Sequence, residues 1–403
     1  MLQTQKKSFG EKIYPWLLVL LPVLNQYQVG PVDLDVIVMT IFFLCAVFFY
    51  RNIRISPVGR FVLVLVGYIF FITVANIAIG YKYSPVSDII IRTGKYILYL
   101  LIVFFLGNEC ISYESLMKAY RVVAFAATIY VVIQAVAFYG GGITLPSKIG
   151  GSIKESEVSV GRLRSFYSEP AVMSYSLLPF IVCSLFGKPY RTAKRGYSFD
   201  AGIVSVAIIL STSGMGIAVT AVVWILWVLL QIINGSFKAR EFLLLLSVGI
   251  AAVILYRSGV LEFALERAEN TGEGGAIDSR LSGYKSLELL SSLKLLFGTG
   301  FGNYVVENTF GLDLFRENVS YSSIAQFIFT LGIIGTTMWL LFFVKLFFRG
   351  NRCARITLVV LILLSVFGAP LVGIQFPVWL TLICTQLPDK QFSRKNTLAD
   401  NEI

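Results

Sequence analysis

Long apolar runs dominate this chain and constrain its fold more than any other feature. Runs such as Val36–Tyr50, Phe61–Ala78 and Ser323–Phe348 approach or exceed the roughly 20 apolar residues that a helix needs to cross a bilayer. Apolar residues make up 56% of the sequence and charged residues only 14%, and a soluble core would not need so many runs of this length. We therefore expect an all-α polytopic integral membrane protein, with residues 1–403 forming a single membrane domain.

The apolar runs divide into about twelve expected transmembrane helices. The seventh and eighth are separated only by a tight turn near Ser213 and Gly214. Because no small-residue cleavage site follows Leu24, the first span is expected to remain uncleaved. The expected spans are about 13–29, 33–50, 60–80, 88–106, 117–139, 170–187, 198–213, 215–234, 241–257, 322–346, 355–372 and 374–387.

Positive charge sets the expected orientation of these spans. With the N-terminus in the cytoplasm, most of the 34 lysines and arginines fall in cytoplasmic segments, among them Lys188, Arg191 and the run Arg349, Arg352 and Arg355. Both termini are then cytoplasmic. The net charge of +11 is read as a topology signal, because no coherent basic surface of the kind that binds nucleic acid is visible.

Histidine is absent, and the cysteines form no extracytoplasmic framework. Cys45, Cys183 and Cys384 fall in expected spans, while Cys110 and Cys353 fall in cytoplasmic loops, so no disulfides are implied. Without histidine or a Cys/His cluster, a zinc site is not expected, and we expect no metal or cofactor. The commonest general base is also missing, so any catalysis must use carboxylates, arginines, lysines or tyrosines.

Two connections are long, residues 139–169 and 257–321, and both fall on the outer face in this topology. Long loops in compact proteins are usually functional or disordered. The second contains leucines every three or four residues over 278–296, which predicts an amphipathic helix along the membrane surface. Glycines 298, 300 and 302 follow. They favour a helix stop and turn over a nucleotide-binding loop, because no strand precedes them.

The first long loop ends with the richest group of polar residues. Glu169 precedes Pro170, which suits the first position of a helix, so Glu169 is expected at the helix N-cap. A second interpretation is chemical. Arg162 and Arg164 lie in the same loop, arginine can grip a diphosphate bidentately, and a carboxylate can take a proton from a sugar hydroxyl. The two interpretations are compatible, since a cap would also position a base.

Other charged residues have both a structural and a functional interpretation. Arg280 and Arg316, in the second long loop, are either snorkelling surface charges or parts of a site for an anionic lipid headgroup. Arg92 and Lys95 lie on one face within the fourth span, where a charge is costly. Either Arg92 pairs with Asp88, or the two cations receive a lipid-linked phosphate.

Tyr321 and the glycines that follow it mark the start of the tenth span. Tyr321 is interpreted as an interfacial aromatic anchor or as a substrate contact. Gly332 and Gly335 indicate close helix packing.

Several segments resemble the bacterial surface-polysaccharide polymerases, the Wzy family. The segment from Arg164 to Pro170 is similar to a pattern of that family that reads roughly Arg-x-x-Phe-Phe-x-Glu-Pro before a span. Ser279, Arg280 and Tyr284, followed by Leu296-Phe-Gly-Thr-Gly-Phe-Gly302, resemble its second-loop pattern, and Leu331-Gly-Ile-Ile-Gly335 resembles the next span. The order of these motifs is their specific part, and the likeness covers most of the chain.

The resemblance implies a GT-C-like glycosyltransferase of the bacterial cytoplasmic (inner) membrane. Such an enzyme transfers an undecaprenyl-diphosphate-linked chain to the sugar hydroxyl of another lipid-linked repeat unit. Its expected partners are undecaprenyl-diphosphate-linked oligosaccharides, with a flippase and a chain-length regulator as candidate membrane partners. The implied catalytic residues are Glu169, Arg164 and Arg280. The candidate substrate-binding residues are Arg162, Arg92, Lys95, Tyr284, Arg316 and Tyr321; Tyr284 lies in a matched motif, and the others are expected from their charge or position.

Two alternatives stay open. An O-antigen ligase uses a different acceptor, but related ligases often carry His-Asn where this chain has Tyr321-Ser322. The superfamily's Ser-Arg-Gly is here Ser213-Gly214, without the arginine. A lipid-linked oligosaccharide flippase also has twelve spans, but it predicts repeat-related halves and short loops. The polymerase interpretation further expects the guanidinium groups of Arg164 and Arg280 to converge on one diphosphate.

Overall fold

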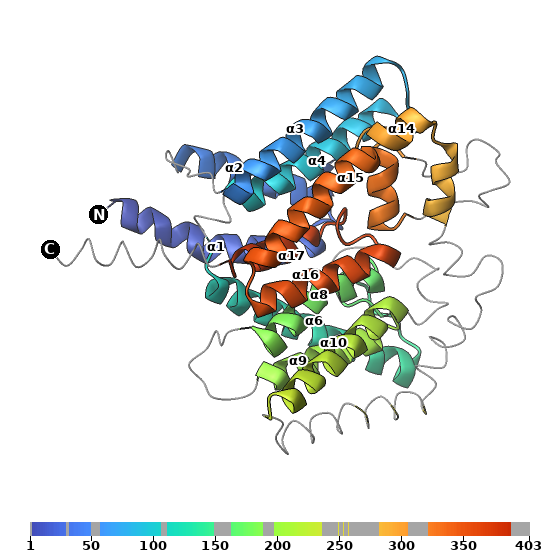
Figure 1. The fold of residues 1–403 in the computed structure, drawn as a ribbon. Coiled ribbons are helices and arrows are strands. Elements are labelled where there is room, and N and C mark those ends of the chain that lie inside the picture. Colours follow the sequence, from blue (N-terminus) through green and yellow to red (C-terminus); the bar gives the residue numbers. More distant parts are fainter. Residues whose placement is uncertain are drawn as a thin grey trace. The chain divides into compact units, whose positions relative to one another are not determined.

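The structure, a computed structural model, is predominantly helical (Figure 1). It describes residues 2–29, 32–49, 57–105, 111–148, 163–187, 197–235, 282–304 and 321–387, together with residues 249, 253 and 257. The chain divides into two compact units. Unit 1 comprises Met1–Ile37 and Ile111–Glu269, and unit 2 comprises Val38–Cys110 and Asn270–Ile403.

Unit 1 is built on the long helix α6. Its helices are α1 (Leu2–Leu24), α6 (Tyr113–Gly141), α8 (Pro170–Phe186), α9 (Tyr197–Leu210) and α10 (Gly214–Ile233), and strands β1 (Gln28–Val29) and β2 (Val32–Asp33) form a two-residue antiparallel pair after α1. Helices α1 and α9 pack on α6, while α9 and α10 pack on α8 (Figure 1). The Ser112 side chain accepts from the Ser115 N–H at the start of α6, and Gly142 (φ 65°) ends it.

An ion pair and a close helix crossing hold the helices of unit 1 together. Arg121 of α6 makes a two-pronged ion pair with Asp200 of α9, with Nε–Oδ2 and Nη2–Oδ1 distances of 2.7 and 3.2 Å. Helices α8 and α10 approach closely at Gly216, where a Cβ atom would lie 2.4 Å from the Ser174 Oγ. A small residue is therefore required at this crossing.

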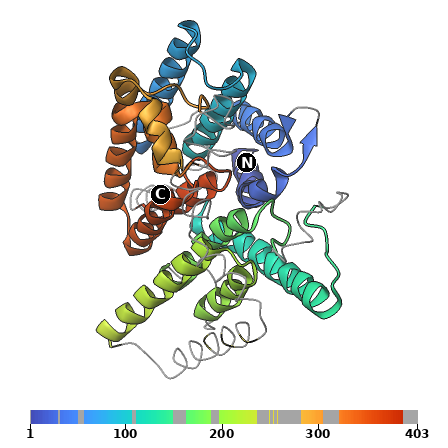
Figure 2. The same ribbon diagram turned by 90° about the vertical axis from the view of Figure 1, so that its right-hand side faces the viewer.

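Unit 2 contains the remaining helices. These are α2 (Leu34–Phe49), which begins in unit 1, α3 (Pro57–Ala78), α4 (Val86–Phe105), the 3₁₀ helix η1 (Ser286–Leu289), α14 (Ser292–Phe297), α15 (Ser323–Arg349), α16 (Arg352–Phe367) and α17 (Phe376–Cys384). Helix α15 packs against α3, α14 and α16, and Figure 2 shows α14 lying along it. Aromatic side chains pack on one another in the core, both stacked and edge to face. The rings of Tyr96 and Phe301 are 4.2 Å apart, and Trp339 packs on Phe342 at 5.5 Å.

Helix α15 is broken at Gly332, where the backbone has φ 67° and ψ −176°. A break frees carbonyl groups that need partners, most of all in a membrane. The loop after α14 supplies two of them: the Thr299 N–H donates to the Phe329 carbonyl (3.1 Å) and the Gly300 N–H to the Thr330 carbonyl (2.9 Å). The Tyr68 hydroxyl of α3 donates to the Leu331 carbonyl at 2.8 Å. The expected span 322–346 is therefore two helical pieces, not one.

Glycine at 332 is needed for packing as well as for its conformation. A Cβ atom there would lie 2.4 Å from the Leu296 carbonyl oxygen, and one at Gly335 would lie 2.6 Å from the Tyr68 ring. The close packing predicted for Gly332 and Gly335 is confirmed, against α14 and α3 respectively. The break itself was not predicted, because only the insertion of residues 298–303 makes it necessary.

Each expected span except the ninth overlaps a described helix, and the ninth, 241–257, lies outside the described residues apart from three isolated positions. Within the described ranges, four helices are long and apolar enough to cross a membrane: Gly59–Ala78, Tyr113–Gly141, Gly214–Ile233 and Ser323–Arg349. Shorter apolar helices cover Lys12–Leu24, Leu34–Cys45, Pro170–Phe186 and Tyr197–Leu210. At 9 residues, α17 reaches only about 13 Å, less than half of the hydrocarbon thickness.

The outer faces of these helices are apolar, as a lipid environment requires. On α6, Ile129, Ile133 and Val136 form a stripe at helical spacing, and the Val136 side chain is 68% exposed. Exposed stripes of this kind on a soluble protein would promote aggregation. The chain is therefore an all-α protein whose apolar helices fit a membrane.

The helix expected over 278–296 is divided in its described part. Residues 282–285 are helical, η1 follows, and α14 then starts afresh at Ser292. The Ser291 side chain accepts from the Lys294 N–H and caps α14. Leu287, Leu289 and Leu290 pack against Phe329 of α15, so these leucines face the protein. Leu293 and Leu296 of α14 are instead exposed, at 65% and 41%. The periodic leucines therefore do not share one buried face, and a serine cap interrupts the expected helix.

Candidate functional site

The expected site residues fall into three groups. Arg162, Arg280 and Arg316 lie outside the described residues. Glu169 and Arg164 lie in unit 1, and Arg92, Lys95, Tyr284 and Tyr321 lie in unit 2. The convergence of Arg164 with Arg280 therefore stays a prediction. Two assemblies of these residues can be described, one in each unit.

The first assembly is the arginine loop, residues 163–169, which enters α8. Its backbone takes an unusual conformation at Ser165, which has a positive φ of 53° although it is not glycine. Gln134 of α6 holds this residue on both sides. Its Oε1 accepts from the Ser165 N–H at 2.8 Å, and its Nε2 donates to the Ser165 carbonyl at 3.3 Å. A buried amide thus stabilises a strained turn.

Further contacts hold the arginine loop to α6 and to the turn that follows α1. The Gln26 side chain donates to the Phe166 carbonyl, and the Phe166 ring stacks on Tyr130 of α6 with ring centres 6.5 Å apart. Within the loop, Leu163 and Tyr167 are buried. Burial raises the pKa of Tyr167, so its hydroxyl stays protonated at neutral pH and does not serve as a base. The loop is therefore anchored at several consecutive residues.

Arg164 is half-buried within this anchored loop. Its Nε donates to the Ser147 Oγ at 2.8 Å, and its Nη1 donates to the Ser168 carbonyl. Both acceptors are uncharged oxygens, and the two contacts orient the guanidinium. A positioned cation of this kind is suited to an anionic group on a substrate.

Glu169 occupies the N-cap position of α8, as predicted from Pro170. Its carbonyl accepts the first helical bond, from the Met173 N–H at 3.0 Å, and Pro170 takes the first helical position. The carboxylate makes no capping hydrogen bond and is exposed. The predicted position is confirmed, but capping by the side chain is not found. The carboxylate is thus accessible to a substrate.

The second assembly, in unit 2, is centred on the glycine-rich loop 298–304. Gly298 (φ 89°) ends α14, which confirms the predicted helix stop. The N–H groups of Thr299 and Gly300 donate to α15, and the Phe301 N–H donates to the Thr73 Oγ1 at 2.9 Å. A phosphate-binding loop needs such N–H groups to face its ligand. Here they are used within the protein, which argues against the nucleotide interpretation.

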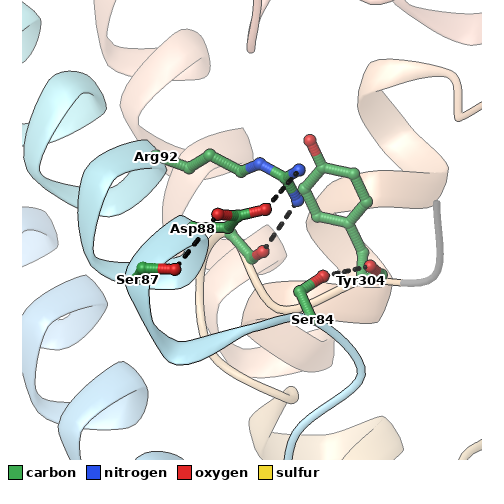
Figure 3. A network of polar contacts seen from close by, with 6 residues as sticks. Ser84, Ser87, Asp88, Arg92 and Tyr304 are labelled. Atoms are coloured by element: carbon green, nitrogen blue, oxygen red, sulfur yellow. Dashed lines mark hydrogen bonds and ion pairs between the residues drawn. The ribbon is translucent and has the colours of Figure 1, made fainter. Parts of the chain in front are cut away.

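Arg92 of α4 lies against this loop, where Figure 3 shows its guanidinium beside the Tyr304 ring. The guanidinium carbon is 4.9 Å from the ring centre, and Nη1 donates to the Gly302 carbonyl at 3.4 Å. The expected pairing with Asp88 is confirmed, with Nη2 and Oδ2 3.6 Å apart. Since Asp88 is 44% exposed, this ion pair contributes little stability.

Lys95, Tyr284 and Tyr321 lie in different surroundings. The Lys95 ammonium lies 5.9 Å from the Tyr99 ring centre, one helical turn beyond Arg92 and with other partners. The Tyr284 hydroxyl donates to the Val366 carbonyl and accepts from the Ser322 Oγ, both at 3.0 Å, so it joins three segments of unit 2. Tyr321 packs on Tyr304 and Phe329, with ring centres 5.4 and 5.7 Å away.

Sequence reasoning missed four residues of this second assembly: Tyr81, Tyr83, Lys294 and Tyr304. The Lys294 ammonium lies 4.1 Å from the Tyr81 ring centre and donates to the Asn76 side chain. Each tyrosine alone has the signature of an interfacial anchor. The sequence did contain one signal for this assembly. Two tyrosines lie close together in the short connection before α4, and two more lie in the C-terminal part of the long loop 257–321.

Comparison with known proteins does not assign either assembly. No protein-family model matches this chain, and no curated protein matches it. The function is therefore argued from the chain's own residues and contacts.

Proposed function

We propose that this protein is a membrane glycosyltransferase that polymerises lipid-linked oligosaccharide repeat units into a surface polysaccharide. In this proposal it transfers an undecaprenyl-diphosphate-linked chain onto a sugar hydroxyl of a second lipid-linked unit. The twelve-span topology, the GT-C-like architecture and the location in the bacterial inner membrane belong to the same proposal. Apolar helices and two charged loops in the sequence support it.

One observation carries the proposal: the strained, anchored loop that presents Arg164 and Glu169 at the start of an apolar helix. Backbone strain at a non-glycine residue costs about 1–3 kcal/mol and persists mainly where the position of a side chain matters. Gln134 of α6 holds Ser165, and Gln26, in the turn after α1, holds the next residue, Phe166. The same segment carries the resemblance to the polysaccharide polymerases.

The chemistry follows from the two charged side chains. During transfer, the bond between the donor sugar carbon and the diphosphate oxygen breaks, and a new bond to the acceptor oxygen forms. Negative charge builds up on the departing undecaprenyl diphosphate, which Arg164 stabilises. Removing one preorganised donor of this kind typically costs about 10²–10³ in rate. Arg280 is the second proposed cation, and the resemblance rather than a described contact supports it.

Glu169 is the proposed proton acceptor for the attacking hydroxyl. Its carboxylate is exposed and makes no capping hydrogen bond, so it is accessible to an acceptor sugar. General-base assistance contributes typically about 10²–10⁴ in rate. Arg164 already has hydrogen bonds to Ser147 and Ser168, which orient it independently of Glu169.

Deleting the gene tests this function in cells. The proposal predicts that polymer disappears while single lipid-linked repeat units accumulate on the outer face of the membrane. Complementation with Arg164→Ala or Arg280→Ala should leave this pattern unchanged, while Lys118→Ala, an exposed cation paired with Glu114 at 2.7 Å, should restore polymer. Normal polymer from both arginine variants would refute the assignment of these residues.

The same assay separates the alternatives. A flippase mutant would trap repeat units on the inner face, and a ligase mutant would leave full-length polymer on its lipid. The broken α15 and the short α17 are features that transporters also use. In α15, however, the loop 298–303 and Tyr68 already satisfy the carbonyls freed by the break, as expected of a fixed structural joint.

A further inference from the structure

Four tyrosines of unit 2 form one continuous group of rings, which we name the tyrosine cluster: Tyr81, Tyr83, Tyr304 and Tyr321. Its buried base is Phe329, which packs against Tyr83 and Tyr321 with ring centres 5.3 and 5.7 Å away. Tyr81 continues from Tyr83 at 5.3 Å, and Tyr304 continues from Tyr321 at 5.4 Å. All four tyrosines are partly exposed.

A cation lies over each end of this group. Lys294 lies over Tyr81 at 4.1 Å, and Arg92 lies over Tyr304 at 4.9 Å (Figure 3). Partial burial lowers the pKa of Lys294, a desolvation cost that an anionic ligand would offset. Two partly buried cations at the edges of one aromatic surface suit a ligand that combines negative charge with a large neutral body.

Asn303 holds the cluster in a fixed arrangement. Its Oδ1 accepts from the Tyr83 N–H at 2.6 Å, and its Nδ2 donates to the Tyr81 carbonyl at 3.0 Å. The Ser84 hydroxyl donates to the Tyr304 carbonyl at 2.8 Å. These bonds join the connection before α4 to the loop after α14, so the rings are positioned before a ligand arrives. Such preorganisation lowers the entropic cost of binding.

We infer that the tyrosine cluster, with Arg92 and Lys294, is a binding site for sugars attached to a phosphate or diphosphate. Aromatic faces carry negative charge density, and the C–H groups of a pyranose ring are weakly positive, so sugar rings pack on them. The tyrosine hydroxyls provide hydrogen bonds to sugar hydroxyls. The two cations then hold the phosphate.

The hydroxyls of the cluster suit this role. Burial and the neighbouring Tyr81 hydroxyl, 2.7 Å away, raise the pKa of Tyr83, so this group stays protonated at neutral pH. A protonated hydroxyl both donates and accepts. An ordinary aromatic belt differs, because its rings point singly into the headgroup region. Here rings from three segments pack on one another and on a buried phenylalanine.

This inference rests on the proposed function for the identity of the ligand, a lipid-linked repeat unit. The shared chemistry, a sugar joined to phosphate, also occurs in free sugar phosphates, which the experiment must distinguish. The purified full-length protein in nanodiscs is therefore titrated with three probes. They are a polyprenyl diphosphate, the same lipid carrying N-acetylglucosamine, and free N-acetylglucosamine 1-phosphate.

The variants divide the site into its sugar-binding and anion-binding parts. Tyr304→Leu and Tyr81→Leu remove a ring, Tyr304→Phe keeps the ring, and Tyr139→Leu is the matched control on α6, where Tyr139 is 45% exposed. Arg92→Gln and Lys294→Met remove one charge each. Thermal unfolding of every variant establishes that it is folded. Two ring variants and two charge variants keep the test decisive if one of them fails to fold.

We expect the sugar to strengthen binding of the lipid by about three- to tenfold in the wild type. Tyr304→Leu or Tyr81→Leu should remove this gain while leaving affinity for the bare diphosphate lipid unchanged, and Tyr304→Phe and Tyr139→Leu should keep it. The charge variants should weaken both lipid probes, and the free sugar phosphate should bind more weakly than the glycosylated lipid. Equal binding of all three probes, or a gain unaffected by the ring variants, would overturn the inference.

A parallel polymerisation assay separates this result from the proposed function. If the wild type shows the ring-dependent gain but makes no polymer from repeat units, the binding site stands and the polymerase assignment falls. If it makes polymer while the ring variants keep the full gain, the assignment of the tyrosine cluster falls and the polymerase assignment stands.

Discussion

The arginine loop of unit 1 and the tyrosine cluster of unit 2 use irregular backbone in opposite ways. In both, one buried amide side chain holds the loop: Gln134 bonds to Ser165, 31 residues along the chain, and Asn303 bonds to Tyr83, 220 residues away. The arginine loop strains an ordinary residue in order to place one cation. The tyrosine cluster uses glycines to pass a loop between helices and gathers rings from distant segments. The comparison teaches that a site made of one local segment can be recognised in the sequence as a motif, whereas a site assembled from distant segments cannot.

The largest expected effect is the loss of stability when Gly332 is substituted. It tests whether unit 2 requires glycine in its irregular backbone, whereas the arginine loop of unit 1 uses serine. Gly332→Ala should destabilise the protein by about 3–5 kcal/mol, because the new Cβ would meet backbone and φ is positive. Thermal unfolding in detergent measures this, with an expected fall in the apparent midpoint of about 4–6 °C. Gly94→Ala is the control, since a Cβ atom at Gly94 would meet no atom within 4 Å and the helix should tolerate it. Equal midpoints for the two variants would show that the break in α15 is not required.

The matching test in unit 1 is Gln134→Leu. It removes the amide and leaves the Ser165 N–H and carbonyl without their partner, at a cost of about 1–3 kcal/mol for each buried group. Polymer synthesis should fall by about tenfold or more as Arg164 shifts, since small misplacements are costly in catalysis. Gln134→Glu keeps the acceptor for the Ser165 N–H, so its rate of polymer synthesis should lie between those of the wild type and Gln134→Leu. The sugar-dependent gain in binding at the tyrosine cluster should be unaffected, and its loss would show that binding at the tyrosine cluster depends on the arginine loop.

Glu169→Gln tests whether the exposed carboxylate contributes to catalysis, to the stability of α8, or to neither. Because its side chain makes no capping hydrogen bond, the substitution should leave the stability of α8 unchanged within about 0.5 kcal/mol. If Glu169 accepts the proton, polymerisation should fall by about 10²-fold or more. Rates from purified variant and wild type at matched folded concentration provide the measurement. Full activity would leave Glu169 with only its backbone role at the start of the helix.

The smallest expected effect is the pH response of Lys294. Its folded-state pKa lies below the ordinary value of 10.5, because partial burial disfavours the charged form. The unfolded state therefore binds more protons in the window between the two values, and stability rises with pH there. Acetylation followed by mass spectrometry between about pH 7 and pH 10 should show Lys294 reacting at lower pH than an ordinary lysine. If Lys294 instead reacts only at higher pH than an ordinary lysine, its pKa is raised. A negatively charged group of the protein would then lie beside it, and the prediction would be wrong.

Much of the fold could be predicted from the sequence, because apolar runs and helix caps are local. The helix start at Pro170, the N-cap position of Glu169 and the helix stop at Gly298 all appear where the residues predict them. The break in α15 could not be predicted, since Gly332 also fits an unbroken span and only the loop 298–303 explains it. The Arg92–Asp88 pair was predictable from helical spacing. The Arg92–Tyr304 contact was not, because nothing local connects residues more than 200 positions apart.

The central claim is that Arg164 stabilises the diphosphate leaving group during chain transfer. The most direct measurement incubates purified wild type and Arg164→Ala, both shown to be folded, with purified lipid-linked repeat units and follows polymer and released undecaprenyl diphosphate together. The account predicts a ladder with one diphosphate lipid released per bond formed in the wild type, and a rate at least about 100-fold lower in the variant. A ladder of normal length and rate from Arg164→Ala, or no ladder from the wild type, would contradict it.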